Sequence, residues 1–296
     1  MEKSNERVCF IYNATARRGR AAKKLEWLKK EASLRWNDFD ILLTGNNGKV
    51  KGINDGEYDA IIACGGDGTI HNTVNQFIDA KVTIGLLPIG SGNDFAKAIS
   101  LPKDEKKCLD ILARGFTRKV DLIRCTGDAD RWCVNTVGAG LDGLANVYTL
   151  RYKKYVGTAG YFFGALHASM RFRGTRMKVI TDENRYDDHF LMITTCNGPI
   201  EGGSFIVAPK ADVYDGYIDI LKIRKTSIPK LLYYLPKFKK EFPEYMKGLS
   251  TDRCKKIKIE TEDPISVHAD GEHLGSEIKN LELSVHEQIL EMIVPE

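Results

Sequence analysis

Apolar runs alternate with a helical pattern in the first third of the chain. The runs are short and continuous, as expected of strands that are buried on both faces of a sheet. Between the first two runs, Leu25, Leu28 and Ala32 fall on one face of a helix spanning 21–34. This alternation predicts an α/β domain with a parallel sheet. The expected strands are 7–13, 38–44, 59–64, 81–90 and 119–125.

After Arg131 the pattern changes to many short alternating runs separated by Gly, Asp and Asn. Such a pattern predicts a mainly antiparallel second domain. Helical periodicity interrupts it at 155–172 and 228–242. The β-like runs are 132–140, 177–182, 189–198, 204–209, 217–223, 256–261, 265–272 and 280–286.

A length of 296 residues suits two domains, each with its own core. We predict a nucleotide-binding domain over 1–124 and a β-rich domain over 125–287. The final residues, 288–296, are expected to return to the first domain.

Composition places the chain among ordinary globular proteins. Hydrophobic residues make up 43% and charged residues 28%, which excludes disordered and collagen-like classes. No apolar run approaches the length of a membrane-spanning helix and the N-terminus is polar, so we expect a cytoplasmic protein without a transmembrane segment. Seven cysteines without a CxxC pair are expected to be reduced and mostly buried.

A net charge of +4 is small for this length, so any attraction to an anionic partner must come from local clusters. No nucleic-acid partner is expected.

The stretch "AIIACGGDGTIHNTVNQFI" places glycines between a strand and a helix. Gly65, Gly66 and Gly68 would leave backbone N–H groups open at a helix N-terminus, which favours phosphate. The structural alternative is a tight turn that uses glycine for its backbone freedom. Asp67 favours the first interpretation, because an acid among phosphate-facing amides indicates a bridging divalent cation and hence a metal-nucleotide. The expected apolar face of the helix is Ile70, Val74, Phe77 and Ile78.

The next strand repeats the arrangement, since it runs into "SGNDFAKAI" at 91–99. Loops at the carboxyl ends of neighbouring parallel strands face one crevice, where open α/β sheets bind their ligands. Neither loop contains GxxxxGK[ST] or GxGxxG, so neither a P-loop nor a standard dinucleotide fold is supported.

Five motifs carry a resemblance to a known family: "GGDGT" (65–69), "PIGSGNDFA" (88–96), "NGPIEGG" (197–203), "APKADVYDGYIDI" (208–220) and "HADGE" (268–272). In this order and spacing they resemble the diacylglycerol kinase catalytic-domain family, in particular its soluble bacterial lipid kinases. "GGDGT" alone is shared with NAD kinases and phosphofructokinases, whereas the later motifs favour the lipid-kinase branch.

The resemblance implies a Rossmann-like parallel sheet of the NAD kinase and diacylglycerol kinase type, followed by a β-sandwich. It also implies a kinase that uses ATP and Mg²⁺ to phosphorylate a lipid hydroxyl, with diacylglycerol as the favoured acceptor and phosphatidic acid as the product. The implied ATP contacts are Asn13, Thr44, Gly65, Gly66, Asp67, Gly68, Thr69, Ile70, His71, Asn72, Ser91, Gly92 and Asn93. The first loop departs from the family pattern, because Ala14 replaces a proline and Arg17 and Arg18 stand among its small residues.

The same resemblance assigns Glu272 as the base that takes the proton of the lipid hydroxyl. Asp67, Asp94 and Asp270 are expected to arrange Mg²⁺ and water around the reaction. A structural Mg²⁺ is implied at Asp212, Asp215 and Tyr217, the outer two through backbone oxygen.

Three segments mix Arg and Lys with aromatic residues: 150–155, 171–176 and 233–240. Such mixtures suit the interface of an anionic bilayer, so we expect a lipid partner and peripheral contact with the inner face of the membrane. The alternative is a solvated helix face whose aromatic rings turn into the core. The oligomeric state is open, a homodimer included.

Several functions remain alternatives. The acceptor is diacylglycerol or another lipid alcohol, such as a sphingoid base, phosphatidylglycerol or a polyprenol. A kinase of NAD shares "GGDGT". An inactive nucleotide- or lipid-binding regulator would keep the fold without catalysis.

Overall fold

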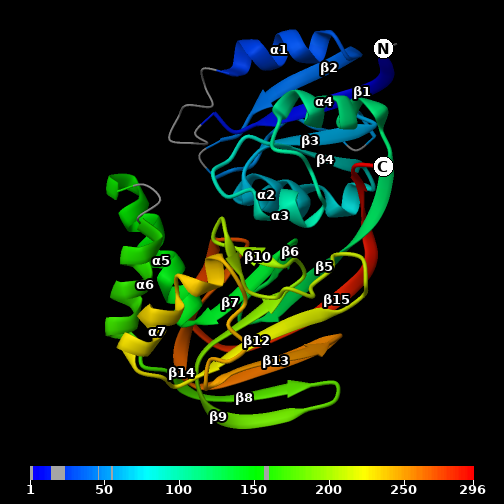
Figure 1. Ribbon diagram of the computed structural model, residues 1–296. Helices are drawn as coiled ribbons and strands as arrows, with labels where there is room; N and C mark the ends of the chain where they lie inside the picture. Colours follow the sequence, from blue (N-terminus) through cyan, green and yellow to red (C-terminus); the bar gives the residue numbers. More distant parts are fainter. Residues whose placement is uncertain (1–2, 15–23, 46, 55, 157–159) are drawn as a thin grey trace. The chain divides into compact units, whose positions relative to one another are not determined.

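The chain divides into two compact units in a computed structural model that describes residues 3–14, 24–45, 47–54, 56–156 and 160–296 (Figure 1). Unit 1 comprises Met1–Asp121 and Gln288–Glu296, and unit 2 comprises Leu122–Glu287. The chain therefore passes between the units after residues 121 and 287, whereas the sequence pattern placed these divisions after 124 and 287.

Unit 1 contains a parallel array of strands in the order β2-β1-β3-β4-β15. All six residues of β3 are buried, which explains why its sequence is a continuous apolar run rather than an alternating one. The strands are β1 (Ser4–Tyr12), β2 (Trp36–Leu43), β3 (Ala60–Gly65), β4 (Thr83–Pro88) and the C-terminal part of β15 (Glu272–Ile293).

The strand expected at 119–125 is present and belongs to both units. It forms β5 (Thr117–Gly127), which pairs with β15 and with β6 (Arg131–Cys133). The position next to β4 is occupied by β15, where Met292 pairs with Ile84. Because unit 1 ends at Asp121, the second half of β5 belongs to unit 2. The local pattern of hydrophobic residues gives no sign of this division.

The helices of unit 1 bury the faces that their periodicity predicts. In α2 (Asp67–Phe77), Ile70 and Val74 are fully buried and Phe77 nearly so. Helix α4 (Glu105–Arg114) is capped at its start by Asp104, whose carboxylate accepts the N–H groups of Lys106 and Lys107, and at its end by Gly115 in the left-handed region. The other helices are α1 (Leu25–Ser33) and α3 (Asp94–Ala98), with a 3₁₀ turn at Ile78–Ala80.

The ladders within unit 2 are antiparallel, as predicted for the second domain. Its long strands β9 and β14 each pair with β8 in their first half and with β7 in their second half, so both contribute to two layers. The register of β14 breaks between Glu260 and Ile265, around Pro264, which allows the bend. The strands are β7 (Thr136–Gly140), β8 (Thr175–Thr181), β9 (Arg185–Cys196), β10 (Ile200–Glu201), β11 (Phe205–Ile206), β12 (Ile218–Arg224), β13 (Leu249–Cys254) and β14 (Lys256–Ala269).

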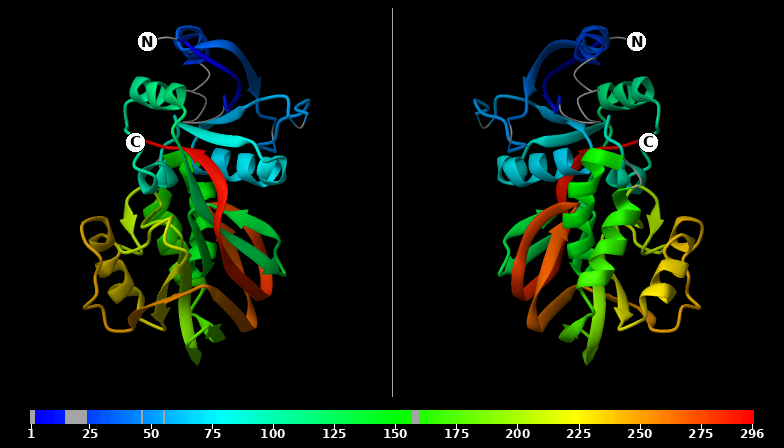
Figure 2. Two further views of the ribbon diagram at one scale, coloured as in Figure 1. Left: turned by 90° about the vertical axis from the view of Figure 1, so that its right-hand side faces the viewer. Right: turned by 90° about the vertical axis from the view of Figure 1, so that its left-hand side faces the viewer.

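Helices of unit 2 cover a second core beside its strands (Figure 2). They are α5 (Leu141–Val156), α6 (Gly160–Arg171) and α7 (Ile228–Tyr234), followed by a 3₁₀ turn at Lys237–Lys239. The sequence analysis missed α5, whose Leu141, Leu144, Ala145 and Tyr148 share one face and pack in this core. Its start lies directly on β14: a Cβ on Gly143 would stand 2.1 Å from the backbone oxygen of Ser266. Within the described residues no helix is long and apolar enough to cross a bilayer.

Candidate active site

The two glycine loops of unit 1 pack backbone against backbone at the carboxyl ends of β3 and β4. The N–H of Gly90 donates to the carbonyl of Gly65 over 2.9 Å. A Cβ on Gly90 would lie 2.3 Å from the Cα of Gly66 and 2.8 Å from its nitrogen. The contact between the loops therefore requires glycine at these positions, whatever ligand the loops bind.

Asp67 connects the same two loops through its side chain. Its Oδ1 accepts the N–H groups of Asp94, over 2.7 Å, and Phe95, over 3.1 Å, at the start of α3. The acid thus has a structural function that the sequence analysis did not anticipate. Its presence alone no longer indicates a cation, and its role at Mg²⁺ stays a prediction.

Asn13 and Asn93, two of the predicted nucleotide contacts, form side-chain hydrogen bonds within unit 1. The Nδ2 of Asn13 donates to Thr69 Oγ1 over 3.1 Å. Asn93 has φ of 54° and donates to the carbonyls of Pro88 and Gly90. Its Oδ1 is buried and, among the described residues, has no hydrogen-bond donor. The carboxylate of Asp94 is 2.8 Å from the ammonium group of Lys97, so a metal that bound Asp94 would have to compete with this cation.

Other residues predicted to contact ATP take different positions. Ile70 and His71 are only 0% and 2% exposed, so their side chains are not available to a nucleotide. Ser91 is exposed, and the N–H of Thr44 donates to the carbonyl of Tyr12 over 3.0 Å. Arg17 and Arg18 lie outside the described residues.

Glu272 stands next to a two-residue hairpin turn in unit 2. Asp270 and Gly271 form the turn with φ of 52° and 84°, and Ala269 pairs with Glu272 across it. Two positive φ values are characteristic of a type I′ turn, which matches the twist of the flanking strands. The side chain of Glu272 is exposed and forms no hydrogen bond or ion pair among the described residues. A carboxylate in this position can accept a proton without first losing another partner.

Asp270 holds the turn in place. Its Oδ1 accepts the N–H groups of Asn135 and Thr136, its Oδ2 accepts that of Val134, and Cys133 Sγ lies 3.0 Å from Oδ1. The residue is only 6% exposed, so these charge-assisted bonds form away from water. We infer that Asp270 positions the turn that carries Glu272, while its predicted role at Mg²⁺ is untested.

Replacing Asp270 by asparagine should lower the free energy of unfolding by about 1–3 kcal/mol, because buried N–H groups lose a charged acceptor. The measurement is urea denaturation of the full chain. Asp128→Asn is the matched control, since Asp128 accepts the N–H groups of Lys279 and Asn280 at an exposed position and should give a smaller loss. Equal stability of Asp270→Asn and the unchanged protein would contradict the structural role.

A buried cluster of Asp142, Glu201 and His268 lies behind this turn. His268 Nε2 is 2.9 Å from Glu201 Oε1 and 3.5 Å from Asp142 Oδ1. Burial opposes a charged ring, but the charges of Glu201 and Asp142 outweigh it and raise the pKa of His268 to about 10. The N–H of Gly271 donates to Nδ1 over 3.3 Å, a bond that only the neutral ring with its proton on Nε2 can accept, so this contact opposes the charged form that the two carboxylates favour.

Both protonation states of His268 keep a proton on Nε2. These three residues are the one group of His, Cys, Asp and Glu side chains in the described part of the chain that is close enough to share a metal ion. A metal would have to displace the Nε2 proton, so the cluster is better explained as a hydrogen-bonded support of the turn. The sequence analysis did not connect His268 with Asp142 or Glu201.

The predicted structural Mg²⁺ site lies in the turn before β12. Asp212 Oδ1 accepts the N–H of Tyr214, and Asp215 Oδ1 accepts that of Tyr217. The guanidinium of Arg253 lies 2.9 Å from Asp215 Oδ2. A cation therefore already balances Asp215, and a metal here would compete with it.

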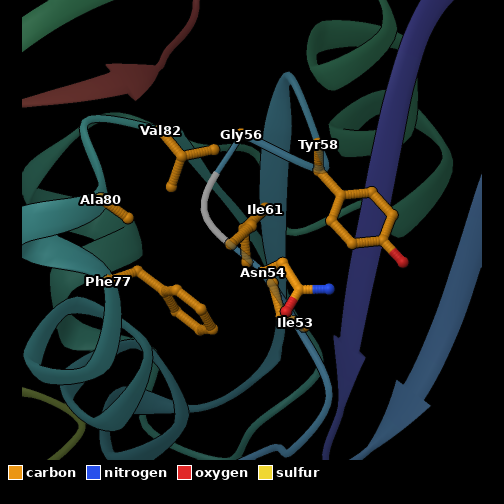
Figure 3. A pocket seen from close by; sticks show the side chains of 8 residues that line it. All are labelled: Ile53, Asn54, Gly56, Tyr58, Ile61, Phe77, Ala80 and Val82. Carbon is orange, nitrogen blue, oxygen red and sulfur yellow. The ribbon is translucent and has the colours of Figure 1, made fainter.

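The hollow in Figure 3 is distinct from these loops. It is lined by Ile61 from the start of β3 and Phe77 from the end of α2, with Ile53, Asn54, Gly56, Tyr58, Ala80 and Val82 around them. Ligands of open α/β sheets bind beyond the carboxyl ends of the strands, whereas Ile61 lies near the amino end of β3. The hollow does not contribute to the candidate site.

Comparison with known proteins assigns both halves of the chain. Residues 7–125 match the diacylglycerol kinase catalytic domain, and residues 135–294 match the YegS C-terminal NAD kinase beta sandwich-like domain. A diacylglycerol kinase of Mycobacterium tuberculosis is 30% identical over 218 residues, which are 72% of this chain and 70% of that protein.

Solved structures show the same fold. A diacylglycerol kinase from Bacillus anthracis str. Sterne aligns with a TM-score of 0.73 and 21% identity over 99% of this chain and 98% of its own. An NAD kinase from Archaeoglobus fulgidus, solved in complex with ATP, aligns more distantly, with a TM-score of 0.52 and 11% identity over 98% of this chain and 94% of its own. The resemblance noted in the motifs is confirmed: the chain belongs to the diacylglycerol kinase family and is a lipid kinase that transfers phosphate to a hydroxyl group.

Proposed function

We propose that this lipid kinase phosphorylates diacylglycerol to phosphatidic acid with ATP as donor. The observation that carries the proposal is the position of Glu272, an exposed carboxylate beside a hairpin turn that Asp270 holds through buried hydrogen bonds. A base must be available to its substrate and be carried on a well-positioned backbone; the Glu272 side chain is exposed, and Asp270 holds the turn beside it. The name of the Mycobacterium tuberculosis relative supports the choice of acceptor.

Unit 1 is proposed to be a Rossmann-like nucleotide-binding unit. Its parallel strands end at the two packed glycine loops, and helix α2 begins at Gly66, so N–H groups of its first turn are oriented toward an incoming phosphate. The proposed contacts with ATP are the residues named from the motifs. Among them, Asn13 is hydrogen-bonded to Thr69, and Asn93 is held by its bonds to the carbonyls of Pro88 and Gly90.

In the proposed mechanism, Glu272 takes the proton of the lipid hydroxyl while the hydroxyl oxygen attacks the γ-phosphorus of ATP. The bond from the γ-phosphorus to the β,γ-bridging oxygen breaks, and ADP leaves. Asp67, Asp94 and Asn93 offer oxygen ligands for Mg²⁺, which when bound would neutralise charge on the transferred phosphoryl group. Asp270 keeps Glu272 in position. Unit 2 is proposed to bind the lipid, and the protein to act in the cytoplasm at the inner face of the membrane.

Transfer of radiolabelled γ-phosphate from ATP to purified acceptors in detergent micelles tests the function. The panel is diacylglycerol, a sphingoid base, phosphatidylglycerol, a polyprenol and NAD. Labelled phosphatidic acid would support the proposal. A labelled product of another lipid or of NAD would show that this molecule, and not diacylglycerol, is the acceptor. ATP binding without transfer to any acceptor would leave the regulator as the function.

The turn at 212–217 gives a separate prediction about metal. We propose that Asp212, Asp215 and Tyr217 hold a structural Mg²⁺ in competition with Arg253. Chelation should then lower the melting temperature by about 2–4 °C for each kcal/mol of lost binding free energy. Asp215→Asn should remove this dependence on Mg²⁺. A melting temperature of the unchanged protein that is equal with EDTA and with millimolar Mg²⁺ would exclude the site.

A further inference from the structure

The basic and aromatic segments named in the sequence analysis have two interpretations, and the structure separates them. In 171–176, Phe172 packs into the core and Arg176 pairs with Asp187, which is the ordinary surface alternative. In 150–155, the side chains of residues 153–155 lie outside the described part of the chain. The segment around 233–240 gives the opposite result.

That segment turns one set of rings inward and another outward. Leu231, Phe238 and Met246 are buried in the core of unit 2. Tyr233 and Tyr245, in contrast, are 63% and 58% exposed. Single exposed apolar residues are common on protein surfaces. Two large exposed rings in a segment that also has a buried face are less common and need an explanation.

Lys237 organises the exposed rings into one surface. Its ammonium group lies 4.2 Å from the ring centre of Tyr233 and 5.1 Å from those of Tyr234 and Tyr245. It also donates to the hydroxyl of Tyr233 over 3.1 Å. We call these four residues, Tyr233, Tyr234, Lys237 and Tyr245, the tyrosine–lysine surface. Cation–π contacts of this kind hold the rings in position before any partner arrives.

The charge around this surface indicates its partner. Residues 225–247 contain six lysines and two glutamates, a surplus of four positive charges, which equals the net charge of the whole chain. Lys239 and Lys240 are exposed beside the tyrosine–lysine surface. Tyrosine has an apolar body and a polar hydroxyl and is enriched at the interface of bilayers, while lysine is attracted to anionic headgroups.

We propose that the tyrosine–lysine surface, with Lys239 and Lys240, docks unit 2 on an anionic lipid surface. The inference deepens the proposed function, because it assigns the part of the molecule that meets the membrane carrying the substrate. In Figure 1 the segment follows α7, which lies next to α6. Docking through exposed side chains needs no rearrangement of the core.

Sedimentation of the full chain with lipid vesicles tests the proposal. Vesicles of phosphatidylcholine with phosphatidylglycerol should bind the protein, and vesicles of phosphatidylcholine alone should bind it weakly. The double variant Lys239→Gln with Lys240→Gln should lower the partition coefficient about tenfold to thirtyfold, as expected for two lysines near an anionic surface. Tyr233→Ser with Tyr245→Ser should also reduce binding, and this loss should persist at high salt, where charge is screened.

A second basic stretch offers the matched control. Residues 17–30 contain seven basic residues and Glu26, but Trp27 is their one aromatic residue. Lys29→Gln with Lys30→Gln removes the same charge from α1 and should leave vesicle binding nearly unchanged. Vesicle binding that falls equally in this control, or that persists in both surface variants, would overturn the proposal. So would self-association that the tyrosine variant abolishes, because it would assign the surface to a second copy of the chain.

Kinase activity separates this inference from the proposed function. The surface variants should keep the activity of the unchanged protein toward diacylglycerol presented in detergent micelles, since none of the altered residues belongs to the candidate site. Activity lost in micelles as well would contradict the assignment of these residues to docking. If the protein binds vesicles but phosphorylates no lipid, the assignment of the docking surface stands and the proposed function is wrong.

Discussion

Glu272→Gln should reduce phosphoryl transfer by about 10²–10⁴-fold, the usual contribution of a positioned general base. Glutamine keeps the size of the side chain and the backbone pairing with Ala269, but it cannot accept the proton of the hydroxyl. The side chain is exposed and has no partner among the described residues, so the melting temperature should not change. The affinity for ATP should also be retained, because the proposed nucleotide contacts belong to unit 1.

Steady-state transfer to diacylglycerol, ATP titration and thermal unfolding together test this assignment. Glu277→Gln is the matched control, since Glu277 is an exposed glutamate of the same strand and should retain full activity. Turnover of Glu272→Gln at the rate of the unchanged protein would exclude Glu272 as the base. A large fall in ATP affinity would indicate that the residue supports the nucleotide instead.

Gly90→Ala should weaken ATP binding about tenfold to a hundredfold and should also destabilise unit 1. The added Cβ would stand 2.3 Å from the Cα of Gly66, and backbone atoms cannot move aside as the end of a side chain can. Strain from overpacking typically costs about 1–3 kcal/mol. If the loops relieve this strain by separating, ATP must supply that free energy to bring them back, and each 1.4 kcal/mol is a factor of ten in affinity.

Isothermal titration with ATP and urea denaturation measure the two effects of Gly90→Ala. Gly45→Ala is the control, because its Cβ would meet the side chain of Asn47 at 3.3 Å and no backbone atom closer than 3.5 Å. It should leave both quantities nearly unchanged. If a folded Gly90→Ala protein binds ATP with unaltered affinity, the contact between the two loops is not required for nucleotide binding.

The elements that could be predicted from the sequence are those with a strong local pattern. The buried strands β1, β3 and β4 are continuous apolar runs, and the apolar face of α2 repeats at helical spacing. Helix α5 was missed although Leu144, Ala145 and Tyr148 pack against the second core at helical spacing. The strand beside β4 comes from residues some 200 positions away, near Met292, and a local pattern carries no information on such a pairing.

The candidate site shows the same division. The residue types of the site were predicted from the motifs. Several motifs of glycines and acids at the ends of strands are more than turn formation alone requires. The partners of those acids could not be predicted, because Asp67 binds N–H groups of a loop 27 residues away and Asp270 binds those of residues 134–136. A carboxylate that caps a distant backbone looks, in sequence alone, the same as one that binds a metal.

The return of β15 to unit 1 has a consequence for the order in which the protein forms during synthesis. Unit 1 begins at the N-terminus, yet its parallel array includes Met292, and Val294 donates its N–H to the carbonyl of Phe116. Met292, Ile293 and Val294 are all nearly fully buried. The part of unit 1 that precedes unit 2 in the chain therefore cannot complete its core until residues 288–296 have been made. Until then the edge of β4 is exposed to other chains.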